Sequence, residues 1–565
     1  MDKAEVRRRY LQNDSGAFVE EAIDGLIMGS GGRLCRLEFN EHTRVVLSNV
    51  RPLPLKEKVA ILTGGGSGHE PSFGGLVGDF LDASVCGEVF ASPTTLAVSR
   101  AMDAIAGKPG CLVVVLNYTG DRLNFGISVE DAKRRGLRAK MVIVGDDIAI
   151  PGSRQPRGVA GMVFVLKIAG AAAERGGSLD EVYLVAEAAA QNVFSIGASF
   201  STCSLPGKPR SDRLGDGNME IGLGIHGEPG VETLPFGKAA DICRKMVLRL
   251  KEAVGQERLD RPMALLVNNL GGLTKVEESL AVGASVKALR EEGFSNIVLV
   301  ASGVVMSSLD MQGFSISLLD LTCHPDAHDH LLRGTNAPGW APFQPVVAEP
   351  AVVLSVAAAA ISSDEPAAAR SPATADGQRL KTLLEKALDA VASKADYLDE
   401  LDSFVGDGDC GTTMLQGVEQ VRNDMAGYDF DDPGEVMASL ATTARSIGGT
   451  SGVLYRLGFA AASAHFAAHP KSSWPSVLKV ACEGIQKYGG AELGDRTMLD
   501  ALIPAAMETD PVKMAEAAEA GCEKTRYMEA RAGRSAYIKK ETLDGHPDPG
   551  SVAVCSWLSA IVQHL

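Results

Sequence analysis

Several common signals are missing from this sequence of 565 residues. Its 10 cysteines form no C-x-x-C pair, which favours a reducing cytosol over a disulfide framework. No stretch approaches the roughly 20 apolar residues that a membrane span needs. The first segment, MDKAEVRRRYLQNDS, carries charge but lacks the apolar core of a secretory signal. These absences predict a cytoplasmic protein with no membrane partner.

A net positive charge and the common phosphate-binding loop are also absent. The formal net charge is −16 and no basic stripe offsets it, so a nucleic-acid partner is not expected. Lys108, Lys208 and Lys238 each follow a glycine, but none of them precedes Ser or Thr. The chain therefore has no G-x-x-x-x-G-K-[ST] loop, and any ATP that it binds must be held in another way.

What the first 340 residues do have is a repeated pattern of short apolar runs that end in glycine or a polar turn. Examples are KVAILTGGGSG, CLVVVLNYTG, KMVIVGDD, ALLVNNLGG and NIVLVASGVV. Such runs are typical of strands buried on both faces, and the helical stretches between them predict an α/β architecture with largely parallel sheets. Functional residues in such sheets collect in the loops at the carboxyl ends of the strands.

The composition changes after this part of the chain. Residues 362–377, SSDEPAAARSPATADG, lack an apolar period and are typical of a linker. An apolar stripe at helical spacing follows, made of Leu380, Leu383, Leu384, Ala387, Leu388 and Val391. We therefore expect an α/β domain over residues 8–340, a linker over 341–376 and an all-helical domain over 377–565.

The helical part carries the acidic loop LDSFVGDGDCGTTML, in which Asp402, Asp407 and Asp409 lie within eight residues. Like charges this close repel one another unless a cation lies between them, and Mg²⁺ prefers carboxylate and phosphate oxygens. An ordinary Asx-Gly turn between helices explains the loop alone equally well. An EF-hand Ca²⁺ loop fits less well, because its bidentate Glu is missing.

Three further stretches favour a nucleotide site. SIGGTSGVL leads into an apolar helix and can present backbone N–H groups to phosphate. The stretches YGGAELGDRTMLDAL and AGRSAYI…PDPGS add glycine-rich turns, with Arg496 and Arg534 as candidate partners for an anion.

In the α/β part, three residues capable of nucleophilic or acid–base chemistry follow the apolar runs. His69 ends LTGGGSGH, Asp121 ends LNYTGD, and His226 lies within GLGIHGEPG. A single histidine is more often structural than functional. An imidazole can nevertheless act as a nucleophile or a proton carrier, and a nearby carboxylate can accept a hydroxyl proton.

A histidine-rich segment near the end of the α/β part, CHPDAHDH, has spacings that a metal could use. It lies among Asp and Pro residues, which predicts an exposed loop with a structural or solvent role rather than a metal site. The residues concerned are Cys323, His324, His328 and His330.

In this order, LDSFVGDGDCGTT, GGTSGVLY, GGAELGDRTMLDALIPA, GRSAY and PDPG resemble the nucleotide-binding L domain of dihydroxyacetone kinases, over essentially all of residues 377–565. The resemblance implies a closed barrel of α-helices that binds ATP. It implies that Asp402, Asp407 and Asp409 bind two Mg²⁺ ions bridging the phosphates. It also implies a nucleotide site lined by Cys410, Gly411, Thr412, Thr413, Thr450, Ser451, Gly489, Met498, Arg534, Asp548, Pro549 and Gly550.

The stretches LTGGGSGHEPSFGG, LNYTGDRLNFG, GIHGEPG, NNLGGLTKVE and SSLDMQGFSISLL likewise resemble the K domain of the same kinases, over residues 8–340. The resemblance implies two α/β subdomains and a homodimer built through the K domains. It implies that His226 adds through a ring nitrogen to a ketone, giving a covalent hemiaminal, while His69 and Asp121 orient and deprotonate the terminal hydroxyl. The substrate site that it implies also includes Gly66, Ser67, Gly68 and Leu116.

Two positions depart from the family pattern. Family members usually have lysine where this chain has Leu116, and many have a second histidine where it has Phe73. Apolar groups in these places change the polarity and shape of the region near the ketone. The substrate is therefore left open between dihydroxyacetone and a four-carbon ketose such as L- or D-erythrulose.

The sequence thus predicts an ATP-dependent kinase of a short-chain ketose with Mg²⁺ as its cofactor. Fused K and L domains point to ATP, rather than a phosphotransferase protein, as the phosphate donor. A regulator that binds the ketone without turnover is a rival of another class, although a pure sensor needs no L domain. A lyase that forms cyclic FMN from flavin-adenine dinucleotide is a second enzymatic rival that the resemblance allows.

Overall fold

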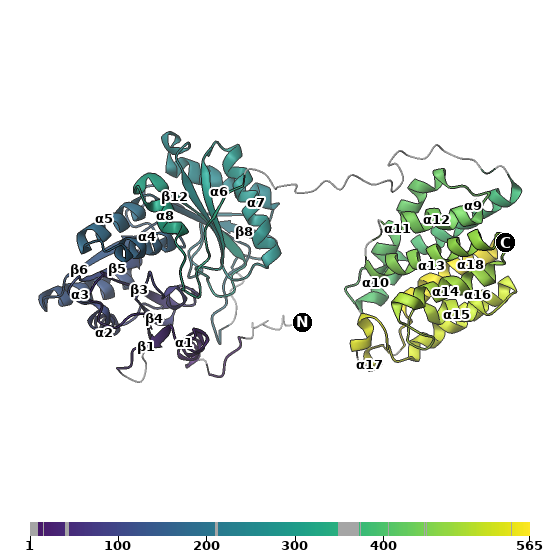
Figure 1. The fold of residues 1–565 in the computed structure, drawn as a ribbon, viewed down its shortest axis with the longest axis horizontal. Coiled ribbons are helices and arrows are strands. Elements are labelled where there is room, and N and C mark those ends of the chain that lie inside the picture. Colours follow the sequence, from purple (N-terminus) through teal and green to yellow (C-terminus); the bar gives the residue numbers. More distant parts are fainter. Residues whose placement is uncertain are drawn as a thin grey trace. The chain divides into compact units, whose positions relative to one another are not determined.

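The computed structural model describes residues 10–14, 16–39, 44–208, 213–347, 372, 374–404, 406–445, 447, 449–538, 540–543 and 545–565. The chain divides into two compact units, Met1–Val353 and Leu354–Leu565 (Figure 1). Most of the expected linker lies outside the described residues. Within the described ranges, no helix is both long enough and apolar enough to cross a bilayer.

The first unit contains a six-stranded sheet in the order β1-β2-β4-β3-β5-β6. The pairs β3–β4, β3–β5 and β5–β6 are parallel, while β1–β2 and β2–β4 are antiparallel at one edge. Most of this sheet is therefore parallel, as the sequence predicts. Its strands are β1 (Leu34–Arg36), β2 (Val45–Ser48), β3 (Ala60–Ser67), β4 (Ala83–Val89), β5 (Cys111–Leu116) and β6 (Ala139–Val144).

A second, seven-stranded sheet has the order β13-β11-β10-β12-β7-β8-β9. The prediction of largely parallel strands is wrong here, because β10–β11 is parallel and the other named pairs are antiparallel. An apolar run predicts that both faces of a strand are buried. Helices can cover both faces of a sheet whether its strands are parallel or antiparallel, so such runs do not predict strand direction. The strands are β7 (Val193–Ser199), β8 (Asn218–Ile221), β9 (Glu232–Pro235), β10 (Met263–Asn269), β11 (Ile297–Gly303), β12 (Gly313–Asp320) and β13 (Gln344–Pro345).

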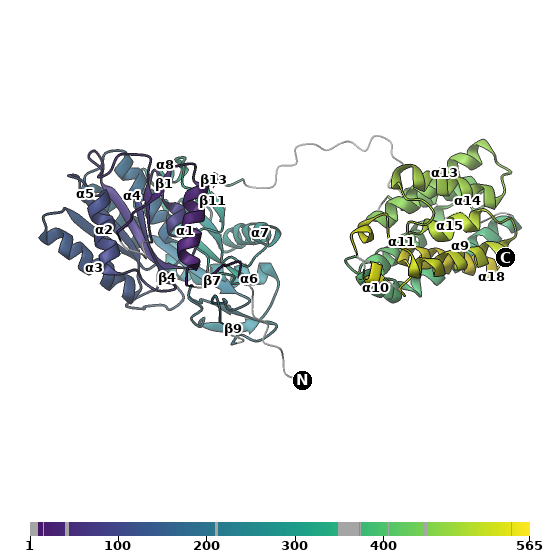
Figure 2. The same ribbon diagram turned by 90° about the horizontal axis from the view of Figure 1, so that it is seen from below.

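Helices and sheets alternate as layers in this unit (Figures 1 and 2). Helices α2 and α3 cover the outer face of the first sheet, α4 and α5 lie between the sheets, and α6 and α7 cover the second sheet. Successive residues of β5 therefore enter different cores: Val114 faces α4 and α5, and Val115 faces α2 and α3. The helices are α1 (Phe18–Gly29), α2 (Thr95–Ile105), α3 (Thr119–Arg134), α4 (Met162–Glu174), α5 (Leu179–Gln191), α6 (Ala239–Val254), α7 (Lys275–Glu291) and α8 (Ala327–Leu332).

The second half of the histidine-rich segment is helical, so the prediction of an exposed loop is wrong for that half. Residues 327–330 begin α8, which packs against α4. His330 is buried, and its ring stacks on that of His324 with 5.7 Å between centroids, while His328 is exposed. Pro325 and Asp326 lie in the turn before α8, and within the helix His328 and Asp329 are exposed while Ala327 and His330 are buried.

The described residues of the second unit form helices and no strand, as predicted. The helices make a closed ring, in which α9 contacts α11, then α13, α14, α15, α16 and α18 follow, and α18 returns to α9 (Figure 2). The helical barrel is thereby confirmed. Its helices are α9 (Ala375–Ala392), α10 (Ala395–Ser403), α11 (Cys410–Asp424), α12 (Pro433–Thr443), α13 (Gly449–Ala468), α14 (Trp474–Gly489), α15 (Leu499–Ala506), α16 (Pro511–Lys524), α17 (Lys540–Leu543) and α18 (Pro549–Gln563).

Candidate functional site

The first unit brings His69, Asp121 and His226 together from three separate loops. His69 follows β3, Asp121 lies in the first turn of α3 after β5, and His226 follows β8. The rings of His69 and His226 meet edge to face, with 4.9 Å between their centroids. The Asp121 carboxyl is close enough to His226 for the imidazole to lower its pKa against the larger effect of burial.

His69 is a neutral hydrogen-bond acceptor. It is 1 % exposed, and its Nδ1 atom lies 2.9 Å from the carbonyl oxygen of Ser307. Because a carbonyl can only accept, Nδ1 carries the proton and Nε2 offers a lone pair. Burial, followed by the charge of His226, lowers the pKa of His69 to about 3. Its buried Nε2 atom has no partner within the described residues.

His226 is held in one tautomer by Glu228. Oε2 of Glu228 accepts a hydrogen bond from the backbone N–H of His226 at 3.0 Å, and Oε1 lies 3.2 Å from Nδ1. Burial would raise the pKa of Glu228, but its hydrogen bonds and its electrostatic interaction with His226 outweigh burial and lower that pKa. An ionised Glu228 keeps the proton on Nδ1 and leaves the lone pair of Nε2 free to attack an electrophile.

Two further polar atoms at this site, Tyr118 Oη and Asp121 Oδ1, are buried with no partner in the described part of the chain. Tyr118 packs edge to face against His226, with 4.7 Å between centroids, and burial raises the pKa of its hydroxyl. Asp121 is 5 % exposed, and burial raises its pKa to about 6. A donor, a base and the acceptor of His69 are groups that a small polyhydroxy ligand can satisfy.

Gly66, Ser67 and Gly68, at the end of β3, pack closely against residues 87–91. A Cβ atom on Gly66 would lie 2.7 Å from a backbone nitrogen of that segment, and one on Gly68 would lie 2.8 Å from the Phe90 ring. Ser67 donates its hydroxyl to a carbonyl of the same segment at 2.8 Å. Larger side chains would separate the strand end from Phe90, whose ring stacks on the adjacent histidine at 5.0 Å.

The two positions that depart from the family pattern are both buried. Leu116 ends β5 and is 2 % exposed, and its Cδ2 atom lies 2.6 Å from where a Cβ atom on Gly158 would be. Phe73 meets His69 edge to face, with 6.4 Å between ring centroids. Phe73 therefore borders the histidine site, while Leu116 packs in the apolar core between the sheets.

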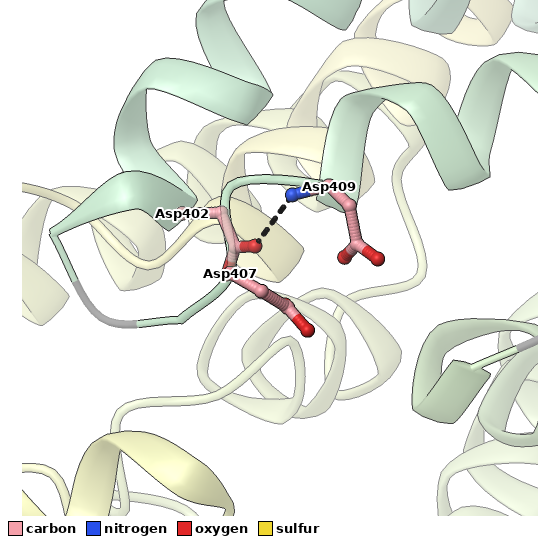
Figure 3. A group of neighbouring side chains, drawn as sticks. All are labelled: Asp402, Asp407 and Asp409. Carbon is pink, nitrogen blue, oxygen red and sulfur yellow. Dashed lines mark hydrogen bonds between the residues drawn. The ribbon is translucent and has the colours of Figure 1, made fainter. Parts of the chain in front are cut away.

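In the second unit, the three predicted metal ligands lie where α10 passes into α11 (Figure 3). Asp402, Asp407 and Asp409 each offer a carboxylate oxygen, and these oxygens all lie within 4.8 Å of one another. The backbone N–H of Asp409 donates to Oδ2 of Asp402 at 3.1 Å, which closes the loop (Figure 3). Carboxylates gathered in this way are the donor set that Mg²⁺ prefers, so the residues present fit the predicted metal.

Asp399 organises the first turn of α11, where four predicted nucleotide residues lie. It accepts hydrogen bonds from the backbone N–H groups of Gly411 at 2.5 Å and Thr412 at 3.0 Å, and from the Thr412 hydroxyl at 2.8 Å. Burial opposes ionisation, but these bonds outweigh it and lower the pKa of Asp399. Burial and the surrounding carboxylates raise the pKa of Cys410, so its thiol stays protonated. Thr413 completes this turn.

Two other predicted nucleotide segments lie close to α11 and to each other. Thr450 and Ser451 are in the first turn of α13, and a Cβ atom on the preceding Gly449 would lie 4.0 Å from the Thr413 side chain. Gly489 ends α14, where a Cβ atom would lie 3.4 Å from Leu454 of α13. The structure thus brings the starts of α11 and α13 side by side.

The PDPG turn starts α18. Asp548 caps this helix by accepting a hydrogen bond from the Ser551 N–H at 2.7 Å, and burial raises the pKa of Asp548 to about 6. Pro549 is the first residue of the helix. A Cβ atom on Gly550 would lie 3.2 Å from the Cβ atom of Met498. The predicted residues Met498 and Gly550 are therefore in contact.

Arg496, expected to bind an anion, instead holds backbone groups. It is 1 % exposed, and its Nε and Nη2 atoms donate to the carbonyls of Thr525 at 3.1 Å and His546 at 2.8 Å. Its Nη1 atom is buried and finds no partner among the described residues. The guanidinium therefore ties the turn before Met498 to the turn before α18. The side chain of Arg534 lies outside the described residues.

Sequence reasoning did not identify Glu228, Tyr118 or Asp399. Glu228 lies two residues after His226, and Tyr118 lies three residues before Asp121, so closeness to a candidate was an available signal. Asp399 lies three residues before Asp402, on the same face of α10. A helical periodicity test of the acidic loop could have included it.

Two domain families match separate parts of the chain, the Dak1 domain over residues 34–339 and the DAK2 domain over residues 404–563. A protein of Solanum lycopersicum named "Putative 3,4-dihydroxy-2-butanone kinase" is 40% identical over 98% of this chain and 97% of its own. The human protein named "Triokinase/FMN cyclase" is 35% identical over 99% of both chains. The chain belongs to the dihydroxyacetone kinase family.

A solved structure of the dihydroxyacetone kinase family matches the whole chain. The crystal structure of the dihydroxyacetone kinase from C. freundii, in complex with AMP-PNP and Mg²⁺, superimposes with a TM-score of 0.70 at 32% identity. The match covers 98% of this chain and 99% of that one. Both units of this family member therefore have counterparts in one solved kinase chain.

Proposed function

We propose that this protein transfers the γ-phosphate of ATP to a terminal hydroxyl of a short-chain ketose, dihydroxyacetone first, held as a covalent hemiaminal on His226. One observation carries the proposal: His69 Nε2, Tyr118 Oη and Asp121 Oδ1 are buried without partners in the described residues, around the His226 ring. Buried polar atoms are unfavourable unless a ligand satisfies them. The AMP-PNP and Mg²⁺ complex of the C. freundii kinase supports ATP and magnesium as the second half of the reaction.

Capture of the ketose starts at Nε2 of His226. Because Glu228 holds the proton on Nδ1, the Nε2 lone pair attacks the carbonyl carbon and a C–N bond forms. The carbonyl π bond breaks, its oxygen gains a proton, and Nδ1 loses one, so the hemiaminal is neutral. A ketone of three carbons offers few contacts, and the covalent bond holds it while rejecting glycerol, which has no carbonyl.

Transfer of phosphate uses Asp121 as the base and His69 to orient the hydroxyls. The Asp121 carboxylate takes the proton of the terminal hydroxyl, and the oxygen bonds to the γ-phosphorus as the bond to the β–γ bridging oxygen breaks and ADP leaves. A base whose pKa is raised to about 6 accepts this proton more readily than an ordinary aspartate does. The Nε2 lone pair of His69 accepts a hydrogen bond from a substrate hydroxyl.

We further propose that Asp402, Asp407 and Asp409 hold two Mg²⁺ ions together with ATP. Bound there, magnesium would neutralise charge on the phosphates. The nucleotide would be lined by Cys410, Gly411, Thr412, Thr413, Thr450, Ser451, Gly489, Met498, Arg534, Asp548, Pro549 and Gly550. Transfer requires both substrates to meet during turnover, within one chain or across a cytoplasmic homodimer built through the α/β units, and we favour the dimer.

A four-carbon ketose is the second candidate substrate. Phe73 places an apolar ring beside His69 where an imidazole is usual in the family, which changes the polarity and shape of the site, while Leu116 lies in the core between the sheets. The name of the Solanum lycopersicum relative also specifies a four-carbon ketone.

The test is ADP release with Mg–ATP and glycerol, dihydroxyacetone, glyceraldehyde, L-erythrulose, D-erythrulose or 3,4-dihydroxy-2-butanone. We expect a ketose to give the highest kcat/KM and glycerol to be inactive. Equal turnover of glycerol would contradict covalent capture. Failure of every ketose, while ATP still binds, would favour a ketone-binding regulator, and release of cyclic FMN from flavin-adenine dinucleotide would identify the lyase activity.

A further inference from the structure

Two motifs of the first unit, NNLGGLTKVE and SSLDMQGF, contribute no residue to the chemistry above, yet their backbones meet beside the histidine pair. The Ser308 N–H donates to the Leu270 carbonyl at 2.9 Å. A Cβ atom on Gly271, whose φ is +109°, would lie 2.1 Å from the carbonyl oxygen of Leu309. Only glycine permits this approach, so the two motifs are built to touch. Residues 305–310 are called the clamp segment below.

One side of the clamp segment holds His69. The Ser307 N–H donates to the His69 carbonyl at 3.1 Å, and the Leu309 N–H donates to the Gly68 carbonyl at 2.8 Å. The Ser307 carbonyl accepts the Nδ1 proton of His69 at 2.9 Å. Two backbone bonds fix the position of this histidine, and the third fixes its tautomer.

The residue between these two reaches the other histidine. Ser308 is fully buried, and its hydroxyl donates to the carbonyl of Ile225 at 2.5 Å. Ile225 directly precedes His226. Consecutive residues of the clamp segment are therefore bonded to His69 and to the residue before His226.

Both ends of the clamp segment are anchored by buried side chains. Oδ1 of Asn268 accepts from the N–H groups of Val305 and Met306, both at 3.0 Å, and its Nδ2 donates to the Met306 carbonyl at 2.8 Å. At the other end, Asp310 accepts from the Ser204 N–H at 2.7 Å and the Ser204 hydroxyl at 3.0 Å. A segment without helical or strand bonding of its own is thereby fixed in place.

We propose that the clamp segment sets the separation and orientation of His69 and His226, with Ser308 and Asn268 as positioning residues for covalent capture. The proposal rests on the proposed function, because it assigns these residues to the hemiaminal step. Neither residue touches the ketose; each acts through a histidine. Capture needs Nε2 of His226 aimed at the carbonyl carbon while His69 accepts a hydroxyl, and a displacement of about 1 Å lowers such rates by about a hundredfold.

The test compares Ser308→Ala with the matched control Thr63→Val. Thr63 is equally buried, and its hydroxyl donates at 2.7 Å to the carbonyl of Val114, which lies in strand β5 of the same unit. We expect both variants to lower Tm, but only Ser308→Ala to lower kcat/KM for dihydroxyacetone, by about ten- to a hundredfold, with an unchanged KM for ATP. The adduct is measured without ATP by NMR of dihydroxyacetone labelled with carbon-13 at C2, whose ketone signal is lost when C2 becomes tetrahedral.

Two further variants separate positioning from folding. Ser308→Thr keeps the hydroxyl and should restore the adduct, whereas Asn268→Asp loses the donor to Met306 and should weaken it. A normal adduct in Ser308→Ala and Asn268→Asp would overturn the proposal, and so would an equal loss in Thr63→Val. The wild type tests the underlying function separately: absence of its adduct contradicts hemiaminal capture, whereas a wild-type adduct that survives in both variants contradicts the clamp alone.

Discussion

The candidate acid–base groups of the first unit and the candidate metal ligands of the second unit differ in how far they are buried. In the first unit, Asp121 and His69 are buried, and their pKa values move toward the neutral forms. In the second unit, Asp407 and Asp409 are exposed, and the neighbouring Asp399 has a lowered pKa. Buried groups with unsatisfied atoms suit an uncharged ketose, and an exposed acidic loop suits a cation that arrives with an anion. On the proposed function, the two units would separate the site for a neutral substrate from the site for a highly charged one.

The largest effect is expected when the proposed nucleophile of the histidine site is removed. His226→Ala should lower kcat/KM for every ketose by about a thousandfold or more, because it removes the imidazole whose Nε2 atom would form the bond to the ketone. The adduct should disappear from carbon-13 NMR, and ATP affinity, measured by calorimetry, should stay the same. An adduct that persists in this variant would assign capture to another residue.

The corresponding test of the acidic loop is Asp407→Asn. It should lower kcat by about a hundredfold or more and leave the ketose adduct intact, because only the metal ligand is lost. ADP release over a Mg²⁺ titration measures this effect. The matched control is Asp389→Asn, which removes an exposed carboxylate paired with Arg422 at 2.7 Å on α9. Undiminished turnover in Asp407→Asn would contradict the metal role.

The pH dependence of kcat/KM tests the role of Asp121, with a smaller expected effect than the two substitutions above. kcat/KM should fall as the pH decreases through about 6, because protonated Asp121 cannot accept the hydroxyl proton. The folded pKa of about 6 lies above the 3.8 of an ordinary aspartate, so the folded state binds this proton more tightly than the unfolded chain. The contribution of Asp121 to the free energy of unfolding therefore decreases as the pH rises from about 3.8 to about 6.

Asp121→Asn supplies the control for this titration. It should abolish the acid limb of the activity together with most turnover, and unfold at pH 8 at a temperature no lower than that of the wild type. The reason is that the variant no longer buries a carboxylate with an unpartnered oxygen. A wild-type kcat/KM that stays constant through pH 6 would exclude Asp121 as the base.

The smallest effect is expected at Leu116. Leu116→Lys should raise the kcat/KM for dihydroxyacetone relative to L-erythrulose by a few-fold, because it restores a donor usual in the family. It also buries an ammonium in the core, and should lower the free energy of unfolding by about 3 kcal/mol. Leu116→Met, which conserves volume, should change neither quantity. An unchanged substrate ratio in Leu116→Lys would make this position irrelevant to specificity.

Much of the architecture could be predicted from the sequence because it is decided locally. The run CLVVVL has no polar interruption, and it forms β5 with each face in a different core. Strand direction is decided by distant partners: the buried run of β10, MALLVNN, pairs parallel with β11 on one side and antiparallel with β12 on the other. The helices of the second unit were predictable for the same local reason, since an apolar stripe repeats at helical spacing, whereas their closure into a barrel was implied by the family resemblance.

The candidate site residues also divide into those that a local pattern marks and those that only distant contacts define. His69, Asp121 and His226 could be selected because each stands beside a recognisable run or turn. Ser308 could not, because its hydroxyl matters only through Ile225, which is 83 residues away in sequence. The burial of Arg496 was likewise missed, since a glycine-rich turn gives no sign of whether its arginine faces solvent or the interior.

The hydrogen bonds from Gly411 and Thr412 to Asp399 hold a carboxylate at the start of α11. The first N–H groups of α11, which would otherwise attract a bare phosphate, are already occupied by a carboxylate. Metal-free ATP approaching this loop would meet repulsion from Asp399 and the three neighbouring aspartates, whereas a nucleotide that carries divalent cations would meet attraction. We therefore expect the start of α11 to take up ATP together with its divalent cations in preference to metal-free ATP.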